Sequence, residues 1–376
     1  MQLNNDQLKA INGALNCEFI FSITGSAGTG KSTVIKQIYS KLKEDGKSCT
    51  VIAPTGRAAN LLRDKIGDSC TIHKFLRYTT HDNGDTYKPS HNRFNMIEDY
   101  SYVIVDEASM VSREVADNLM SALPDKTRLI LVGDKNQLPP IENTPQESFF
   151  NICLRKYPSV YLNERYRFGN QVALSELSDA VLEGSFKKIA QSGIAYRLDG
   201  VSDSRWLNKL ASNEKYYTLD AQIISPVYRG VTGCEYINKL CQLHRFGDSK
   251  PIFNNMYSGD KVIAKINCDQ FTNGDIMYLK DVTDNSIIFE EKTVDRWYNP
   301  CKGKVIDLAH CIMPAYCITT HKSQGGEYND VVYIIGKSSI PVVNRANIYT
   351  GVTRSSSNLI VLYDYYTLIT GLKKCE

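Results

Sequence analysis

Residues 19–44 read FIFSITGSAGTGKSTVIKQIYSKLKE, and this stretch decides the fold. The apolar run at residues 19–23 predicts a buried strand, and the periodic run at residues 34–44 predicts a helix. Between them, the spacing Gly25-x-x-x-x-Gly30-Lys31-Ser32 matches the phosphate-binding P-loop pattern in full. A strand before the loop and a helix after it disfavour the alternative, a glycine-rich turn with a purely structural role.

The P-loop pattern predicts a site for a nucleoside triphosphate. Glycines let backbone N–H groups turn toward phosphates, and the N-terminus of the following helix adds a favourable dipole. Lys31 is expected to neutralise the β- and γ-phosphates, and Ser32 to bind Mg²⁺. We therefore expect ATP and Mg²⁺ here, with contacts from Gly25, Ser26, Ala27, Gly28, Thr29, Gly30, Lys31, Ser32 and Thr33.

Three further apolar runs, at residues 49–53, 102–105 and 129–132, each end in polar residues. Strands that alternate with helices in this way predict a parallel sheet with its ligand at the carboxyl edge. The second run ends at Asp106-Glu107, where Asp106 is expected to hold Mg²⁺ through water and Glu107 to polarise the attacking water. Such an acidic pair can also be a solvated turn, but its position after a P-loop favours the Walker B function. Together the two motifs predict an ATPase.

The rest of the chain predicts a second α/β domain and two small insertions. Strands are expected at residues 221–225, 331–335 and 359–363, whereas residues 77–99 are polar and contain the hairpin signal Asn83-Gly84. Short β-type runs with glycine and aspartate turns fill residues 259–317 and predict a small β-barrel. The predicted domains are residues 1–160 with the insertion 77–99, then 161–258 with 318–376, and the inserted barrel 259–317.

Composition sets limits on the class of protein. The 376 residues carry a net charge of +3, which excludes a polyelectrolyte tail or a strongly acidic scaffold but leaves a local basic groove open. The 11 cysteines are scattered, so free thiols in a reducing compartment are expected, and Cys311, Cys317 and His321 lack a fourth metal ligand at matching spacing. No signal peptide and no apolar run long enough to span a membrane is found, so we expect a soluble intracellular protein without a membrane partner.

Further motifs follow in an order that resembles the superfamily 1 helicases of class B, in the Dda- and RecD-like group with its Pif relatives. The resemblance covers nearly the whole chain, from Gln7 to about Leu362. It rests on Asn5–Gln7, Ala53–Ala59, Thr71–Phe75, Asp106–Met110, Leu131–Pro140, Leu162–Arg167, Ser225–Arg229, Gly259–Val262 with Asn273–Asp275, Thr319–Gly325 and Tyr349–Arg354.

The resemblance implies two RecA-like domains, with a hairpin insertion in the first and an SH3-like barrel in the second. It implies that Gln7 reads adenine, Gln137 senses the γ-phosphate and Glu327 reaches the ribose. Arg167, with Arg165 as the fallback, and Arg354 would be arginine fingers in the second half of the chain; the alternative for each is a surface ion pair. The strand contacts it implies are Pro54, Thr55, His73, Lys74, Phe75, Thr320 and His321, of which the two histidines could instead be structural.

The resemblance also implies an ATP-driven helicase that moves 5′→3′ on single-stranded DNA and opens a duplex fork. The insertion after Arg77 takes the place of the wedge that splits duplex, and its Tyr78, Tyr87 and Phe94 either stack on the fork or anchor a hairpin. A single chain would be the motor, with replication or single-strand-binding proteins as further partners. Two alternatives remain open at this point: an RNA helicase of the same superfamily, and a P-loop ATPase clamp that does not unwind.

Overall fold

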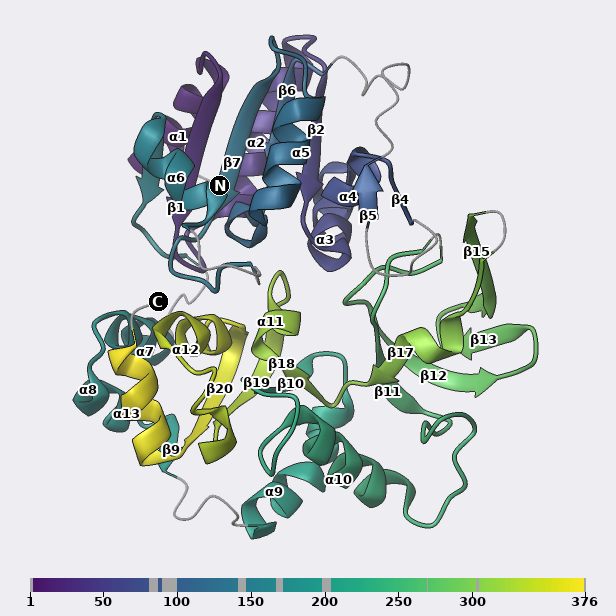
Figure 1. Cartoon of the computed structure of the whole chain (residues 1–376). Coiled ribbons are helices and arrows are strands. Elements are labelled where there is room, and N and C mark those ends of the chain that lie inside the picture. The colour runs from purple at the N-terminus through teal and green to yellow at the C-terminus, as the bar shows by residue number, and fades with distance from the viewer. Residues whose placement is uncertain are drawn as a thin grey trace. The chain divides into compact units, whose positions relative to one another are not determined.

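The computed structural model describes residues 3–80, 87–89, 100–140, 147–166, 172–197, 204–268, 270–301 and 304–374. The chain divides into two compact units, Met1–Gly169 and Asn170–Glu376. Each unit contains a parallel sheet with helices between its strands, which confirms the α/β class (Figure 1). The boundary lies beyond residue 160 because β8 (Ser159–Leu162) pairs with β1 (Ile20–Gly25) in the sheet of the first unit.

The sheet of unit 1 has the strand order β3-β2-β6-β7-β1-β8, and all its pairings are parallel. The P-loop strand β1 therefore lies beside β7, and β7 lies beside β6. The remaining elements of this unit are α1 (Asn5–Leu15), α2 (Lys31–Glu44), β2 (Cys49–Ala53), α3 (Gly56–Ile66), β3 (Ser69–Thr71), α4 (Ile72–Phe75), β6 (Tyr102–Val105), α5 (Arg113–Ala122), β7 (Arg128–Gly133) and α6 (Phe149–Lys156), with a 3₁₀ turn η1 (Ala108–Met110).

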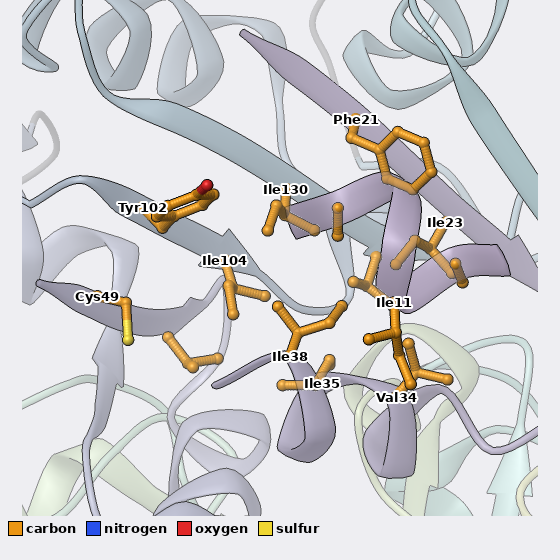
Figure 2. Close-up of a cluster of buried hydrophobic side chains, with 14 of the residues drawn as sticks. Ile11, Phe21, Ile23, Val34, Ile35, Ile38, Cys49, Tyr102, Ile104 and Ile130 are labelled. Carbon is orange, nitrogen blue, oxygen red and sulfur yellow. The ribbon is translucent and has the colours of Figure 1, made fainter. Parts of the chain in front are cut away.

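Two apolar cores cover the faces of this sheet. Successive strand residues alternate between them, so that Ile104 joins the core under α1, α2 and α3 while Val105 joins the core under α5 and α6. Figure 2 shows the first core, in which Ile35 and Ile38 of α2 pack with Ile104 and Ile130 of the sheet. This packing fixes the helix that follows the P-loop against the strand that precedes it.

The sheet of unit 2 has the order β18-β10-β19-β20-β9 and is also parallel throughout. Its core gathers the aliphatic residues of β10 and β19 with one face of α10. The elements are α7 (Val172–Leu182), α8 (Phe186–Ala190), β9 (Ala195–Arg197), α9 (Ser204–Ala211), η2 (Glu214–Tyr217), β10 (Ala221–Ser225), α10 (Cys234–Phe246), β18 (Cys317–Thr319), α11 (Thr320–Ser323), β19 (Tyr328–Ile335), η4 (Lys337–Ser339), α12 (Arg345–Val352), β20 (Ser355–Tyr363) and α13 (Tyr365–Lys373).

Residues 260–314 of unit 2 form a separate β structure, which we call the antiparallel module. Its sheet has the order β14-β13-β12-β11-β17 with antiparallel pairings and its own apolar core. A two-stranded hairpin, β15–β16, is attached to it. The elements are β11 (Asp260–Ala264), β12 (Ile276–Val282), β13 (Ser286–Phe289), β14 (Thr293–Asp295), β15 (Trp297–Cys301), β16 (Lys304–Asp307), η3 (Leu308–Cys311) and β17 (Ile312–Pro314).

The polar insertion of unit 1 is described only at its first part. Strands β4 (Tyr78–Thr80) and β5 (Tyr87–Pro89) pair antiparallel, as a hairpin requires. The turn signal Asn83-Gly84 and Phe94 lie outside the described residues, and only the backbone is described at Tyr78 and Tyr87. The wedge function of these aromatic residues therefore stays a prediction.

Three further sequence expectations concern cysteines, metals and membranes. Nine cysteines have described side chains, and all nine are free thiols. Among the described residues, no group of three or more His, Cys, Asp or Glu side chains is placed to hold a metal ion, which includes Cys311, Cys317 and His321. Within the same residues, no helix is long and apolar enough to cross a membrane.

Candidate nucleotide and strand-binding site

The P-loop connects the end of β1 to the start of α2 and depends on its glycines. Gly28 and Gly30 have φ angles of 83° and 82°, the left-handed region that favours glycine. A Cβ atom at Gly30 would lie 2.5 Å from Nε2 of Gln7, and one at Gly25 would lie 2.6 Å from Oγ1 of Thr29. The local backbone thus leaves no room for side chains at the positions where the sequence has glycine.

Lys31, the first residue of α2, folds across this loop. Its Nζ donates to the carbonyl oxygens of Gly25 at 2.7 Å and Ser26 at 3.0 Å. Thr29 closes the same turn by donating its hydroxyl to the Ser26 carbonyl at 2.9 Å. The loop therefore already has the shape of a phosphate-binding loop. The Lys31 ammonium group binds carbonyl oxygens of the loop, and phosphate oxygens would replace these as its partners.

Gln7 links α1 to the P-loop. It closes a capping box with Asn4, whose backbone N–H donates to Oε1 of Gln7 at 3.2 Å. Its Nε2 donates to the carbonyl of Thr29 at 3.3 Å, and the side chain is buried. Both ends of the amide thus have protein partners in this structure, and the adenine contact stays a prediction.

The acidic pair follows β6 at the carboxyl edge of the sheet. Asp106 is buried, and its pKa is raised to about 7, first by burial, then by the charge of Glu107, while Lys31 acts in the opposite direction. Glu107 has a φ of 50°, and its Oε2 is buried without a hydrogen-bond partner among the described residues. Mg²⁺ prefers hard oxygen ligands such as carboxylates, and a cation would stabilise the ionised forms of Asp106 and Glu107. The acidic pair therefore fits Mg²⁺.

Gln137 reaches the same edge from the segment after β7. Its backbone N–H donates to the Asp134 carbonyl at 3.1 Å, and the neighbouring N–H of Lys135 reaches Oγ1 of Thr24 on β1 at 3.5 Å. The side chain of Gln137 is buried, and no described residue is a hydrogen-bond partner for its Oε1. An acceptor left over in this way suits a water molecule or a phosphate hydroxyl.

The segment after β8 packs on the P-loop of its own unit. The Tyr166 N–H donates to the Gly28 carbonyl at 2.6 Å, and a guanidinium nitrogen of Arg165 lies 3.5 Å from Oγ of Ser26. This placement corrects the expectation that residues 161–166 belong to the second domain, because β8 is an edge strand of the first sheet. Arg167 lies outside the described residues. Sequence reasoning missed Tyr166, for which the sequence shows no signal beyond its place in the motif.

Arg354 of unit 2 lies in the turn between α12 and β20 and is buried. Its guanidinium donates to the carbonyls of Thr350 at 2.9 Å and Gly326 at 3.1 Å, and to the hydroxyl of Thr353 at 3.1 Å. Arg354 thus joins α12 to the segment before β19, where Glu327 lies. The surface ion pair considered as its alternative is excluded in this structure, and the finger function stays a prediction, as does the ribose contact of Glu327.

Five of the seven predicted strand contacts lie in two similar turns that a repeated sequence, Thr-x-His-Lys, could have revealed. Thr71 ends the edge strand β3 and caps α4 by accepting from the Lys74 N–H at 3.1 Å. Thr319 ends the edge strand β18 and caps α11 by accepting from the Lys322 N–H at 3.3 Å. The two capping residues have nearly the same backbone angles, with φ of −75° and −74°. The structure therefore places one such turn at an edge of each parallel sheet.

The individual side chains of these turns differ in exposure. Burial lowers the pKa of both His73 and His321 and so favours the neutral form of each imidazole. Thr320 is fully buried, and its hydroxyl donates to Oδ1 of Asn347 at 3.2 Å.

The other predicted contacts in unit 1 are at least partly accessible. Lys74 is exposed, while the ring of Phe75 packs against Tyr100. Pro54 and Thr55 lie between β2 and α3, and Thr55 caps that helix by accepting from the Ala58 N–H.

A P-loop, an acidic pair and an amide acceptor at one carboxyl edge define a P-loop NTPase. Comparison with known families refines this class. A family described as "AAA domain" matches residues 2–199, and the UvrD-like helicase C-terminal domain matches residues 314–362. The chain belongs to this AAA-domain family, among the RecD- and Pif1-like helicases of superfamily 1 class B.

Relatives that match along most of the chain have low sequence identity to it. The RecBCD enzyme subunit RecD of Buchnera aphidicola (subsp. Schizaphis graminum) is 25% identical over 90% of this chain and 69% of its own length. The ATP-dependent RecD2 DNA helicase of Deinococcus radiodurans is 26% identical over 89% of this chain but only 45% of its own. Among solved structures, Bacteroides Pif1 bound to ssDNA superimposes with a TM-score of 0.63 at 17% identity, covering 96% of this chain and 92% of that one. At this identity the structural likeness supports the fold alone.

Proposed function

We propose that the protein is an ATP-dependent DNA helicase that translocates 5′→3′ on single-stranded DNA and opens duplex DNA. The observation that carries the proposal is the convergence of Lys31, Asp106, Glu107 and Gln137 at the carboxyl edge of the first sheet, in a chain of the RecD- and Pif1-like family. The DNA substrate is supported by the names of the relatives, among them the ATP-dependent DNA helicase Pif1 of Bdellovibrio bacteriovorus. The polarity rests on the resemblance of the motifs to superfamily 1 helicases of class B.

ATP hydrolysis requires stabilisation of the charge that develops on the transferring phosphoryl group. Lys31 would move from the loop carbonyls to the β- and γ-phosphates, and Ser32 and Asp106 would hold Mg²⁺, which neutralises phosphate charge. Glu107 would orient and deprotonate the attacking water with its Oε2. Gln137 would accept a hydrogen bond from that water with its Oε1 and donate to the γ-phosphate with its amide N–H. In our proposal Arg167 and Arg354 supply further positive charge, which requires Arg354 to leave its backbone partners.

Each of the two Thr-x-His-Lys turns is proposed to contact the nucleic-acid strand. Each turn offers a capped backbone and a neutral imidazole, a combination that suits phosphate and base contacts that form and break in each cycle. Pro54, Thr55, Lys74, Phe75 and His321 belong to this proposed surface. We further propose that residues 259–317 are an SH3-like barrel, that residues 77–99 form the wedge at the duplex fork, and that single-strand-binding or replication proteins are partners.

The test is strand-stimulated ATP hydrolysis. Single-stranded DNA and RNA of equal sequence are added to the wild-type chain, to Lys31→Met and to the matched control Lys36→Met, an exposed lysine of the same helix. We expect DNA to stimulate the wild type and the control strongly, and Lys31→Met to remain inactive with intact DNA binding. Equal or greater stimulation by RNA would favour an RNA helicase, and no stimulation by either would favour a P-loop clamp.

A further inference from the structure

Two consecutive charged residues, Asp260 and Lys261, are completely buried where the antiparallel module joins the parallel sheet of unit 2. They open β11, the first strand of the module, and the catalytic chemistry described above does not use them. Lysine and aspartate are almost never fully buried unless they are paired, since removing their charges from water is costly. Their burial therefore indicates a specific function at this junction.

Lys261 binds the module to the motor sheet directly. Its Nζ donates to the carbonyl oxygens of Thr218 at 2.8 Å and Ala221 at 2.7 Å, at the start of β10. Its backbone continues the contact, because the Ala315 N–H donates to the Lys261 carbonyl at 2.8 Å. One residue thus connects the first strand of the module with a central strand of the parallel sheet.

The Asp260 carboxylate accepts hydrogen bonds from the surrounding segments. Its Oδ1 accepts from the hydroxyl of Tyr316 at 2.7 Å, and its Oδ2 accepts from Nε2 of Gln242 on α10 at 2.7 Å and from the Tyr257 N–H at 2.8 Å. The Tyr316 hydroxyl also lies 3.4 Å from the Lys261 N–H, so it bridges the two charged residues.

The segment by which the chain leaves the module, after β17, is also fixed by hydrogen bonds. Only Ala315 and Tyr316 separate β17 from β18, and both are fully buried. Gln222 donates to both of their carbonyls, at 3.0 Å and 2.9 Å. Asn238 of α10 donates to the carbonyls of Pro314 and Cys317 and accepts from the Cys317 N–H.

The junction also leads directly to a proposed strand contact. β18 ends at Thr319, the residue that caps the Thr-x-His-Lys turn of α11. Three strand residues and the buried linker of Ala315 and Tyr316 therefore connect that turn with the module. Buried hydrogen-bonded charges fix one geometry more sharply than apolar packing, which tolerates sliding.

We propose that Asp260 and Lys261 are positioning residues that lock the antiparallel module to β10 and β18, so that the module moves as one body with the strand-binding turn at Thr319–Ser323 during unwinding. This inference rests on the proposed helicase function. It also accounts for the Gly259–Val262 motif, whose two charged residues hold the junction together.

The functional test compares Lys261→Met, which keeps chain length but removes the ammonium donors, with Tyr316→Phe, which removes only the bridging hydroxyl. Lys280→Met, at an exposed lysine of β12 in the same module, is the control. We expect Lys261→Met to keep strand-stimulated ATP hydrolysis within about twofold while base pairs unwound per ATP fall about fivefold or more. In Tyr316→Phe the base pairs unwound per ATP should also fall, but by a smaller factor, and the control should match the wild type.

A second measurement decides the inference independently of helicase activity. Spin labels introduced without cysteine chemistry at Lys239 of α10 and Asp281 of the module report the distance between the two bodies in the full chain. We expect a narrow distribution in the wild type and a broader one in Lys261→Met. An unchanged distribution, or unwinding and ATP hydrolysis that fall in equal proportion, would overturn the inference. A wild type without strand-stimulated hydrolysis would instead refute the proposed function, and the label distances would still decide the locking.

Discussion

Replacing Asp106 with asparagine should make the stability of unit 1 less dependent on pH. The wild-type carboxyl group has a pKa of about 7 in the folded chain against 3.8 in the absence of burial. Asparagine cannot titrate, yet its Oδ1 can still accept the Glu107 N–H, which donates to Asp106 at 2.9 Å. The substitution therefore removes the buried charge while it retains the local hydrogen bond.

The sign follows from proton linkage. Because the folded state holds this proton more tightly than the unfolded state, the stability contribution of Asp106 is full below pH 3.8 and is lost as the pH rises through about 7. Between pH 5 and pH 8, the two pKa values correspond to a loss on the order of 2–3 kcal/mol from the free energy of unfolding. The stability of Asp106→Asn relative to the wild type should increase by this amount over the same interval.

Native-state hydrogen exchange of the β6 and β7 amides measures this free energy, in buffer without nucleotide or magnesium and at several pH values. Glu107→Gln is the matched control. It removes the second cause of the raised pKa, so the pH dependence should persist with a smaller amplitude. A difference between Asp106→Asn and the wild type that changes by less than about 0.5 kcal/mol from pH 5 to pH 8 would refute the reasoning.

Three further substitutions test the P-loop, the core and the strand turn. Gly30→Ala should destabilise unit 1 by about 1–2 kcal/mol and weaken nucleotide binding, because its φ is 82° and the new Cβ would meet Gln7; an unchanged melting temperature and nucleotide affinity would contradict this. Ile38→Ala, in a fully buried position, should lower the free energy of unfolding in urea by about 2–5 kcal/mol, and a loss below about 1 kcal/mol would show that the core relaxes around it. Thr319→Val keeps the shape but removes the cap on the Lys322 N–H, so it should cost about 1 kcal/mol in thermal unfolding and weaken single-strand binding; full retention of strand affinity would argue against the proposed contact.

Local pattern predicted the first sheet well. The P-loop spacing and the apolar runs at residues 49–53 and 102–105 correspond to β1, β2 and β6. The helix after the loop begins earlier than the apolar period suggested, at Lys31, because the last P-loop residues already form its first turn. Such a turn is stabilised by the backbone rather than by buried side chains, so hydrophobic periodicity does not reveal it.

The features that were not predicted from the sequence depend on contacts between residues far apart in the chain. The second domain was expected to begin at residue 161, but residues 159–162 form β8, which completes the first sheet beside β1. This contact joins residues far apart in sequence. Asp260 and Lys261 are typical of a solvated turn in sequence, whereas the structure buries them with Gln242 and Tyr316 as partners of Asp260. Arg354 was placed by its motif, but its inward hydrogen bonds depend on the carbonyl of Gly326, which sequence alone does not bring close.

The central claim, that the chain is a DNA helicase with 5′→3′ polarity, is tested most directly by unwinding of duplexes that carry one single-stranded tail. Two substrates of the same duplex sequence, one with a 5′ tail and one with a 3′ tail, are incubated with ATP and Mg²⁺, with Lys31→Met as the control without turnover. Our account predicts strand separation of the 5′-tailed duplex by the wild type alone. Separation of only the 3′-tailed duplex would contradict the polarity, and separation of neither, with ATP hydrolysis intact, would contradict helicase function.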